Sequence, residues 1–321
     1  MTSSAPHRAR IAAVPPGTSR PVWSVMIPAF NCGRYLGATL ESVLAQDPGP
    51  EAMQIEVVDD HSTQDDPHAV VAAIGRGRVG FYGQPSNVGI TRNFATCLDR
   101  SRGQLVHLLH GDDCVREGFY AKLQRLFERH AEIGAAFCRH VFIDAQGREL
   151  AVSTPEQSDS GVLQNALERL ALEQRIMTPS MVVRRAVYEH LGGFDDRLIC
   201  SEDWEMWVRI AAHYPIGYEV APLAAYRMHE NSNTGRHTRS AEDMRYTRAA
   251  IEIFKDYLPQ AAAQSIVRRA RETYALTAVE GARALLRKRD VVGALAQARE
   301  ALRFRRSPQV LAKVLRTFLW S

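Results

Sequence analysis

The sequence predicts an α/β protein built on a mainly parallel sheet and followed by an all-helical region. Short apolar, β-rich runs alternate with helical segments along the first half of the chain, and the links between them are short. Such alternation is typical of a doubly wound sheet, because consecutive parallel strands need a crossover helix between them. From Ala241 onward the pattern is helical throughout, rich in Ala, Leu, Arg and Glu.

The first predicted elements follow one another closely. A β-rich run over 22–27 precedes Pro28, which we expect to end the strand because proline cannot donate to a central ladder. A helix over 34–46 is stopped by the turn 47–50. A second buried strand is predicted over 55–58.

Four further elements complete the first half of the chain. A helix is predicted over 67–74, a strand over 79–82 and another helix over 87–98. The strand that follows, 105–109, is a short apolar run typical of a buried parallel strand. These elements repeat the β–α unit and place the strands in one sheet.

Polar side chains follow three of these strands at the point where each ends. They are Asn31 after the first strand, Asp59 and Asp60 after the second, and Asp112 and Asp113 after the fourth. The carboxyl ends of parallel strands meet at one edge of a sheet, where open α/β sheets bind their ligands. We therefore expect these side chains to converge on one site.

The pair Asp112–Asp113 has two interpretations. Mg²⁺ typically takes one or two carboxylates plus phosphate oxygens, so the pair would suit a metal-bound diphosphate. Alternatively, these aspartates cap the next helix near its N-terminus. The segment 28–33 does not form the G-x-G-x-x-G turn of a dinucleotide fold, which favours phosphates held through a metal.

The second half offers two more candidate residues. Ser201 is predicted to begin a helix that reaches about His213, with Glu202 and Asp203 in its first turn. These acids either complement the helix dipole or act in chemistry. His229, in a polar segment, is either a surface residue or a ligand.

Composition bounds the class of protein. The chain has 321 residues, 45% hydrophobic and 24% charged, as expected for a soluble globular protein of one large or two ordinary domains. Its formal net charge of +4 is too small to indicate nucleic-acid binding, and no apolar run is long enough to span a bilayer. Five scattered cysteines without a CxxC pair fit a reducing compartment better than a zinc site or disulfides.

The two ends of the chain carry separate expectations. Residues 1–20 are rich in Ala, Ser, Pro and Arg without an apolar core segment, so we expect a disordered tail and not a secretory signal. The last helix, 309–320, has apolar residues with basic Lys313 and Arg316. It either packs on the protein or contacts a membrane surface, and packing is favoured.

Seven stretches, taken together and in order, resemble glycosyltransferase family 2, a large family of inverting enzymes with the GT-A fold. The resemblance covers about 22–235. The matching stretches are SVMIPAFN (24–31), EVVDDHST (56–63), NVGITRN (87–93), LLHGDD (108–113), GFD (193–195), EDW (202–204) and YRMH (226–229). Each stretch is weak alone, whereas seven in the family's order are specific.

The resemblance implies roles for the matching residues. Asp203 would be the general base, Asp112 the metal-ligating acid of the family's D-x-D motif, and His229 a further metal or diphosphate contact. The nucleotide and donor would be held by Pro28, Ala29, Phe30, Asn31, Asp59, Asp60, Asn87, Arg92, Asn93, His110, Gly111 and Asp113. One position departs from the family, because His110 stands where the motif usually begins with Asp. This removes a negative charge near the diphosphate, so we expect a site that still binds metal but more weakly or with altered sugar contacts.

The function implied is transfer of a sugar from a nucleotide-diphospho-sugar, with UDP the family's commonest nucleotide, to an acceptor hydroxyl. The cofactor would be Mn²⁺ or Mg²⁺, the acceptor a glycan, a lipid-linked glycan or another hydroxyl compound, and the pathway bacterial surface polysaccharide. No nucleic acid is expected as a partner. Location would be cytoplasmic, with peripheral contact to the inner membrane left open, as is the oligomeric state.

Three rivals remain at this stage. A non-catalytic nucleotide-sugar or carbohydrate-binding protein on the same scaffold is supported by His110 and opposed by Asp112, Asp203 and His229. A nucleotidyltransferase would be expected to carry a basic Gly-rich loop after its first strand, which 28–33 is not. The helical region could instead serve as an adaptor. Predicted domains are 21–237 for catalysis and 238–321 for the helices.

Overall fold

The computed structural model describes residues 7–229, 237 and 239–319. The chain forms two compact units. The first comprises Met1–Gln164, Ile176–Arg197 and His213–Met228, and the second comprises Asn165–Arg175, Leu198–Ala212 and His229–Ser321. The chain thus passes between the units five times, whereas the sequence suggested a single boundary. That suggested boundary, residue 238, lies outside the described residues.

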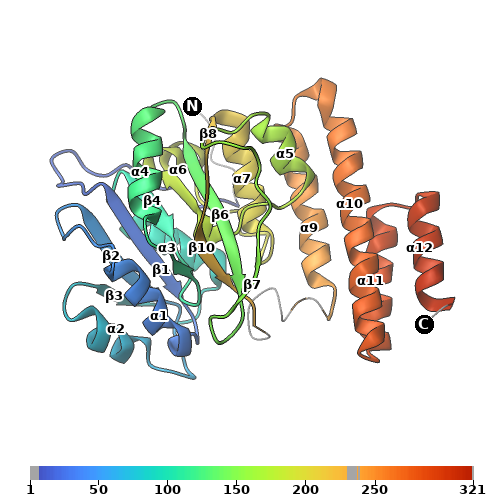
Figure 1. The fold of residues 1–321 in the computed structure, drawn as a ribbon, viewed down its shortest axis with the longest axis horizontal. Coiled ribbons are helices and arrows are strands. Elements are labelled where there is room, and N and C mark those ends of the chain that lie inside the picture. The colour runs from blue at the N-terminus through green and yellow to red at the C-terminus, as the bar shows by residue number, and fades with distance from the viewer. Residues whose placement is uncertain (1–6, 230–236, 238, 320–321) are drawn as a thin grey trace. The chain divides into compact units, whose positions relative to one another are not determined.

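The first unit is built on a sheet with strand order β3-β2-β1-β4-β9-β6-β10-β5. Its first four strands are parallel, as the β–α alternation predicts, and their connecting helices lie beside them (Figure 1). The strands are β1 (Trp23–Ala29), β2 (Met53–Asp59), β3 (Gly80–Gly83) and β4 (Leu105–Leu108). The helices are α1 (Gly33–Leu44), α2 (Pro67–Gly75) and α3 (Ile90–Arg100).

The rest of this sheet is mixed. β9 (Met181–Arg184) runs antiparallel between β4 and β6 (Ala135–Ile143), and β10 (Ile216–Arg227) pairs parallel with β6. Short antiparallel strands complete it, namely β5 (Cys114–Val115), β7 (Glu149–Val152) and β8 (Gly161–Val162). The other helices are α4 (Phe119–Arg129), α6 (Arg185–Leu191) and the 3₁₀ turn η1 (Thr178–Ser180).

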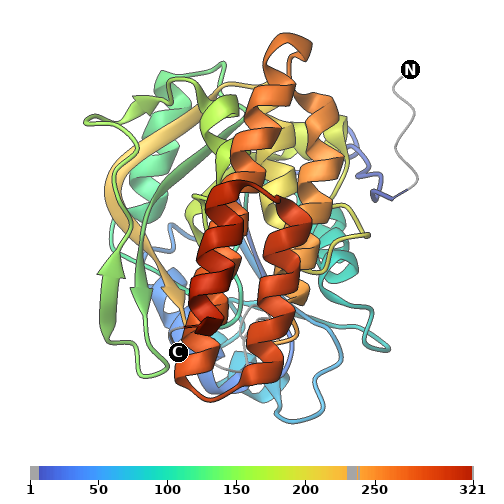
Figure 2. The same cartoon turned by 90° about the vertical axis from the view of Figure 1, so that its right-hand side faces the viewer.

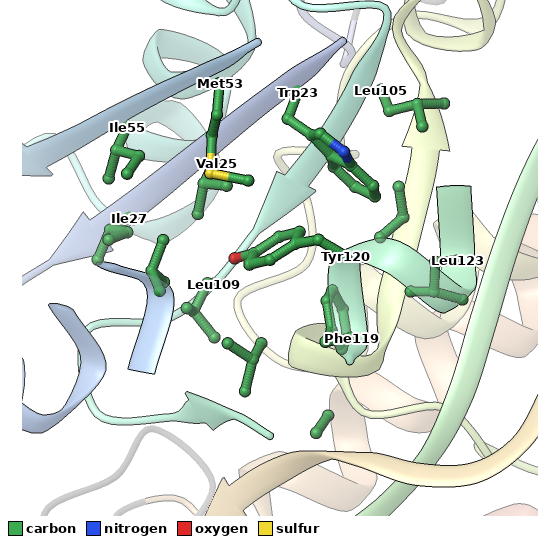
Figure 3. Close-up of a cluster of buried hydrophobic side chains, with 14 of the residues drawn as sticks. Trp23, Val25, Ile27, Met53, Ile55, Leu105, Leu109, Phe119, Tyr120 and Leu123 are labelled. Carbon is green, nitrogen blue, oxygen red and sulfur yellow. The ribbon is translucent and has the colours of Figure 1, made fainter. Parts of the chain in front are cut away.

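A hydrophobic core fixes the helices α1, α2 and α4 on the sheet. Alternate residues of β1, among them Val25 and Ile27, point into it together with side chains of β2 and α4 (Figure 3). At one end the rings of Trp23 and Tyr120 meet edge to face, with centroids 5.0 Å apart. The indole N–H of Trp23 donates to Gln124 at 3.0 Å, so this buried polar atom is satisfied. The core therefore holds the carboxyl ends of β1, β2 and β4 in fixed positions.

The prediction that Pro28 ends the first strand is wrong. β1 runs through Pro28 to Ala29, and Pro28 pairs with Val58 of β2. Its carbonyl accepts a hydrogen bond from the N–H of Gly111 at 3.1 Å, so its missing N–H would point to the same side, toward β4. Pairing of β1 with β4 has already ended at Leu108, so that donor is not needed there.

Residues 7–12 differ from the predicted disordered tail, because they lie against the first unit. The carbonyl of Ala9 accepts from the N–H of Gly193 at 2.8 Å, and Ile11 is buried. Arg8 lies 3.5 Å from the fully buried carboxylate of Asp195, to which Arg197 also donates at 2.7 Å. An opposite charge and one apolar side chain therefore order this segment.

Within the residues that the structure describes, the second unit is all helical. Its elements are α5 (Ala166–Leu172), α7 (Glu202–His213), α9 (Glu242–Phe254), the 3₁₀ turn η2 (Lys255–Tyr257), α10 (Gln260–Arg287), α11 (Val291–Phe304) and α12 (Pro308–Leu319). Trp204 of α7 is buried against the rings of Phe254 and Tyr274, each with a centroid 4.9 Å away. Its indole N–H donates to the carbonyl of Leu170 at 2.6 Å. A mixed sheet flanked by helices, with a helical C-terminal region, confirms the predicted fold class.

Candidate active site

The loops that follow β1 and β2 are joined by hydrogen bonds around Asn31. Its side-chain oxygen accepts from the N–H groups of Thr63 and Gln64 at 2.9 and 3.1 Å. Its own N–H donates to the hydroxyl of Ser62, which in turn donates to Asp59 at 2.5 Å. Asn31 adopts a positive φ of 50°, a conformation that asparagine tolerates better than most residues. Asn31 and Asp59 thus shape one edge of the site, as the sequence predicts for their neighbouring strand ends.

Asp60 ties a third loop to this edge. Its two carboxylate oxygens accept from the N–H groups of Val88 and Gly89 at 2.7 and 3.0 Å, and its carbonyl accepts from the amide of Asn87 at 3.0 Å. Burial raises the pKa of Asp60, and the two backbone donors oppose that rise. Asp60 and Asn87 therefore hold the start of α3 in place.

The two residues predicted at the start of α3 differ in exposure. Asn93 is buried, and its amide donates to the carbonyl of Val58 at 3.0 Å while accepting from Gln84 at 3.3 Å. Arg92 is exposed. The guanidinium of Arg92 is therefore the group that can reach a bound anion, whereas the Asn93 amide joins α3 to β2.

An acidic cluster lies after β4. One ligand atom each from His110, Asp112 and Asp113 falls within 4.8 Å of the others. The His110 ring stacks on Phe94, with centroids 5.4 Å apart, and its Nδ1 lies 3.7 Å from Oδ2 of Asp113. His110 therefore belongs to the same cluster of candidate ligands that the two aspartates form. We refer to these three residues as the acidic cluster.

Gly111, between these residues, has no room for a side chain. A Cβ atom there would lie 2.6 Å from Sγ of Cys32. The N–H of Gly111 also donates to the carbonyl of Pro28, so the backbone after β4 lies directly against the end of β1. This close approach brings the acidic cluster next to the loop that begins at Ala29 and Phe30.

Asp113 is the most buried member of the acidic cluster. Its Oδ1 accepts from the backbone N–H of Arg227 at 2.8 Å, whereas its buried Oδ2 accepts no hydrogen bond within the described part of the chain. Burial raises the pKa of Asp113 well above its usual value, and the charge of Asp112 raises it further. A buried carboxylate oxygen without a donor, beside a second acid and an imidazole, fits a divalent cation.

Arg227, at the end of β10, is hydrogen-bonded to the acidic cluster. Its guanidinium donates to the carbonyl of Asp112 at 2.7 Å and to that of Asp144 at 3.1 Å, and it lies 4.8 Å from the centre of the Tyr35 ring. Arg227 was not among the predicted site residues, although it belongs to the YRMH stretch. Its position within that stretch was the signal that could have identified it.

The second unit contains Asp203, in the first turn of α7. Its two oxygens accept from the side-chain amide of Gln174 and from the N–H of Trp204, both at 2.7 Å. Another acid of that turn, Glu205, is buried and engaged by Arg209 at 3.0 Å and by the Tyr257 hydroxyl at 2.6 Å. Asp203 is half-buried, so it is the more accessible of these two acids.

Glu202 is the buried neighbour of Asp203. It is 5% exposed, and its Oε2 accepts no hydrogen bond from the described residues. Burial raises its pKa from 4.5 to about 8, and the adjacent charge of Asp203 contributes to the rise. Two neighbouring carboxyl groups with different environments are typical of sites where one keeps its proton and the other accepts one. His229, also in the second unit, is half-buried.

These features agree with a comparison against known families. Residues 24–192 match the family model described as glycosyl transferase family 2. This match spans more than half of the chain. The chain belongs to this family. The resemblance inferred from the seven stretches is thereby confirmed, and the chain is a glycosyltransferase.

Relatives of this family-2 glycosyltransferase extend the comparison. An uncharacterized protein of Mycobacterium tuberculosis is 32% identical over 230 residues, covering 68% of this chain and 70% of the relative. The O-antigen biosynthesis protein RfbC of Myxococcus xanthus is 25% identical over 266 residues, covering 77% of this chain but 20% of RfbC. The crystal structure of S. aureus TarS 1-349 in complex with UDP-GlcNAc has a TM-score of 0.64 at 16% identity, covering 92% of this chain and 89% of TarS 1-349. At that identity the likeness shows the fold, which is of the GT-A type.

Proposed function

We propose that this glycosyltransferase moves a sugar from a UDP-sugar to an acceptor hydroxyl, with inversion at the anomeric carbon. The observation that carries the proposal is the acidic cluster at the carboxyl end of β4, where open α/β sheets bind ligands. The buried Oδ2 of Asp113 accepts no hydrogen bond from the described residues. A bound cation would compensate the negative charge of this oxygen. TarS, a structural neighbour, has been crystallised with UDP-GlcNAc, which supports UDP as the nucleotide.

The donor would be held by the loops described above. Pro28 to Asn31 and Asp59 would face the base and ribose, and exposed Arg92 would meet the diphosphate. A Mn²⁺ or Mg²⁺ ion bound by Asp112, with Asp113 and His110 in support, would neutralise the charge that develops on the leaving diphosphate. His229 is proposed as a further metal or diphosphate contact.

Asp203 is proposed as the general base. Gln174 and the N–H of Trp204 fix the orientation of its carboxylate. Glu202, whose pKa is raised to about 8, binds the proton of the pair at neutral pH, which leaves Asp203 to accept the proton of the acceptor hydroxyl. That hydroxyl oxygen then attacks the anomeric carbon in line as the bond to the nucleotide diphosphate breaks. One displacement inverts the configuration and forms no sugar–protein bond.

The acceptor class is proposed from a relative. RfbC, which shares sequence with most of this chain, is named for O-antigen biosynthesis. A growing surface polysaccharide or its lipid-linked precursor is therefore the acceptor we propose. The part of the chain that the structure describes contains no helix long and apolar enough to cross a bilayer.

Calorimetric titration with UDP, GDP and dTDP, each with and without Mn²⁺, tests the donor site. We expect UDP to bind most tightly, with affinity that is lost in EDTA and in Asp112→Asn. Binding that is independent of metal would refute the role of the acidic cluster. If no nucleotide binds at all, the protein is a scaffold without donor chemistry.

The base is tested separately with Asp203→Asn. Because the nucleotide is proposed to bind residues other than Asp203, we expect UDP binding to persist while Mn²⁺-dependent donor hydrolysis falls by about 10²–10⁴-fold. The matched control is Asp159→Asn, an exposed acid of the first unit. Hydrolysis near the wild-type rate in Asp203→Asn would remove Asp203 from the role.

A further inference from the structure

The last described helix, α12, carries two neighbouring apolar stripes, one buried and one exposed. Its inner side packs on the second unit through Val310, which is fully buried, and through Val314 and Phe318. Leu311, Leu315 and Leu319 are 42%, 60% and 75% exposed. Spacings of four residues place these three leucines in one stripe along the helix. Packing, the interpretation favoured from the sequence, therefore accounts for the inner side alone.

The neighbouring helix also exposes apolar side chains. α11 and α12 are joined by three residues and run antiparallel side by side (Figure 2), so the start of α11 lies near the end of α12. Val291, Val292 and Leu295, in the first turns of α11, are 53%, 77% and 55% exposed. Together with the leucine stripe they form what we call the outer face. Six exposed aliphatic side chains on two adjacent helices are more than the scattered apolar residues of an ordinary surface.

The outer face lies in the most basic part of the chain. Residues 286–319 contain nine arginines or lysines and two acids, a net charge of +7, although the whole chain carries only +4. Both acids are already engaged. Glu300 is buried and pairs with Arg248, and Asp290 caps α11 and pairs with Arg239 at 2.6 Å. Arg303 and Arg305 are paired as well, with Glu300 and Glu272, so the positive field comes from the remaining cations.

Exposed cations lie next to the apolar residues in the chain. Arg287, Lys288 and Arg289 are exposed at the end of α10 and just after it, and only Asp290 separates them from Val291 at the start of α11. Arg316 is exposed on α12, next to Leu315. Basic side chains that flank an aliphatic stripe are typical of helices that lie in the interface of an anionic bilayer.

The charge and the side-chain types select one occupant. A second copy of this chain would bring two strongly positive surfaces together, which electrostatics disfavours. Protein interfaces are enriched in aromatic residues, whereas the described outer face is aliphatic. We propose that the outer face of α11 and α12 docks the enzyme on an anionic lipid surface, with the leucines entering the headgroup region and the cations facing lipid phosphates.

Vesicle co-sedimentation of the full chain tests this proposal. The protein is mixed with neutral phosphatidylcholine vesicles or with vesicles that also contain anionic phosphatidylglycerol, at low and high salt. We expect binding to the anionic vesicles that weakens in salt. Leu315→Ser with Leu319→Ser should reduce partition by at least about tenfold. Arg316→Glu should reduce it by about five-fold or more, because a basic residue contributes roughly that factor near an anionic surface.

Matched controls are available on the first unit. Leu150 and Val152 of β7 are 57% and 45% exposed, so their double substitution by serine removes comparable apolar surface elsewhere. These controls should bind like the wild type. Equal loss in both serine pairs, or no vesicle binding by the wild type, would overturn the proposal. A dimer in size-exclusion chromatography that Leu315→Ser with Leu319→Ser dissociates would also overturn it, because a second copy would then cover the face.

Discussion

Replacing Glu202 with glutamine should make the protein more stable, by an amount that grows with pH. Glu202 is buried with one oxygen that accepts no hydrogen bond in the described chain, and its pKa is raised from 4.5 to about 8. An acid with a raised folded-state pKa binds its proton more tightly in the folded than in the unfolded protein. The contribution of Glu202 to stability is therefore greatest below pH 4.5 and declines as pH rises toward 8. Glutamine keeps the shape of the protonated acid and cannot ionise.

The magnitude follows from the size of the shift. One pKa unit corresponds to about 1.4 kcal/mol, so between pH 4.5 and pH 7 the wild type loses roughly 3 kcal/mol that Glu202→Gln retains. The difference should stop growing above about pH 8, where Glu202 is ionised in both states.

Urea unfolding of both proteins at about pH 5, 6, 7 and 8 measures this difference. Glu51→Gln is the control, because Glu51 is exposed and its removal should leave the pH profile unchanged. A difference between Glu202→Gln and the wild type that stays constant across this range would refute the reasoning.

Three further predictions concern the first unit. Asp113→Asn removes a buried charge, so in the absence of metal it should raise the free energy of unfolding at pH 7 by about 1–3 kcal/mol, and it should weaken Mn²⁺ binding. Urea unfolding measures the first effect and calorimetry the second. A metal-free variant less stable than the wild type would contradict the prediction. In the wild type the raised pKa also means that Mn²⁺ affinity should increase with pH. Gly111→Ala should lower the stability of the protein by about 1–3 kcal/mol, because the new methyl group would contact Cys32. Adding Cys32→Ala should restore most of this stability, as measured by thermal unfolding. A double variant no more stable than Gly111→Ala would exclude that contact as the cause. Asp60→Ala should cost about 1–3 kcal/mol, because two backbone N–H groups lose their acceptor, and Asp60→Asn, which keeps one acceptor oxygen, should unfold at a higher urea concentration than Asp60→Ala.

The parallel part of the fold could be predicted because its signals are local. Each of the first strands is a short apolar run, and each helix has its own pattern and stop signal. Pro28 was misjudged because its effect depends on where β4 ceases to pair with β1, which no local pattern records. Residues 7–12 were misjudged for a similar reason, since Arg8 meets Asp195 across a long stretch of sequence.

The candidate site, too, could be predicted only in part from the sequence. The convergence of Asn31, Asp59 and Asp112 follows from strand ends meeting at one edge, which topology alone dictates. The part played by Arg227 does not, because its guanidinium reaches a carbonyl 115 residues earlier in the chain. The burial that separates Glu202 from Asp203 depends on packing in the helical unit and could not be inferred from two adjacent acids.

The surroundings of Trp204 have a consequence for the order of synthesis. The ribosome adds about 5–20 residues per second, and domains generally fold as their chain emerges. Trp204 and its neighbour Asp203 are made well before Phe254 and Tyr274, whose rings cover that indole. A nascent chain that has completed the sheet of the first unit therefore still lacks the packing that supports Asp203. If Asp203 is the base proposed above, ribosome-bound intermediates should bind a nucleotide before they can transfer a sugar, so incomplete chains would not consume donor.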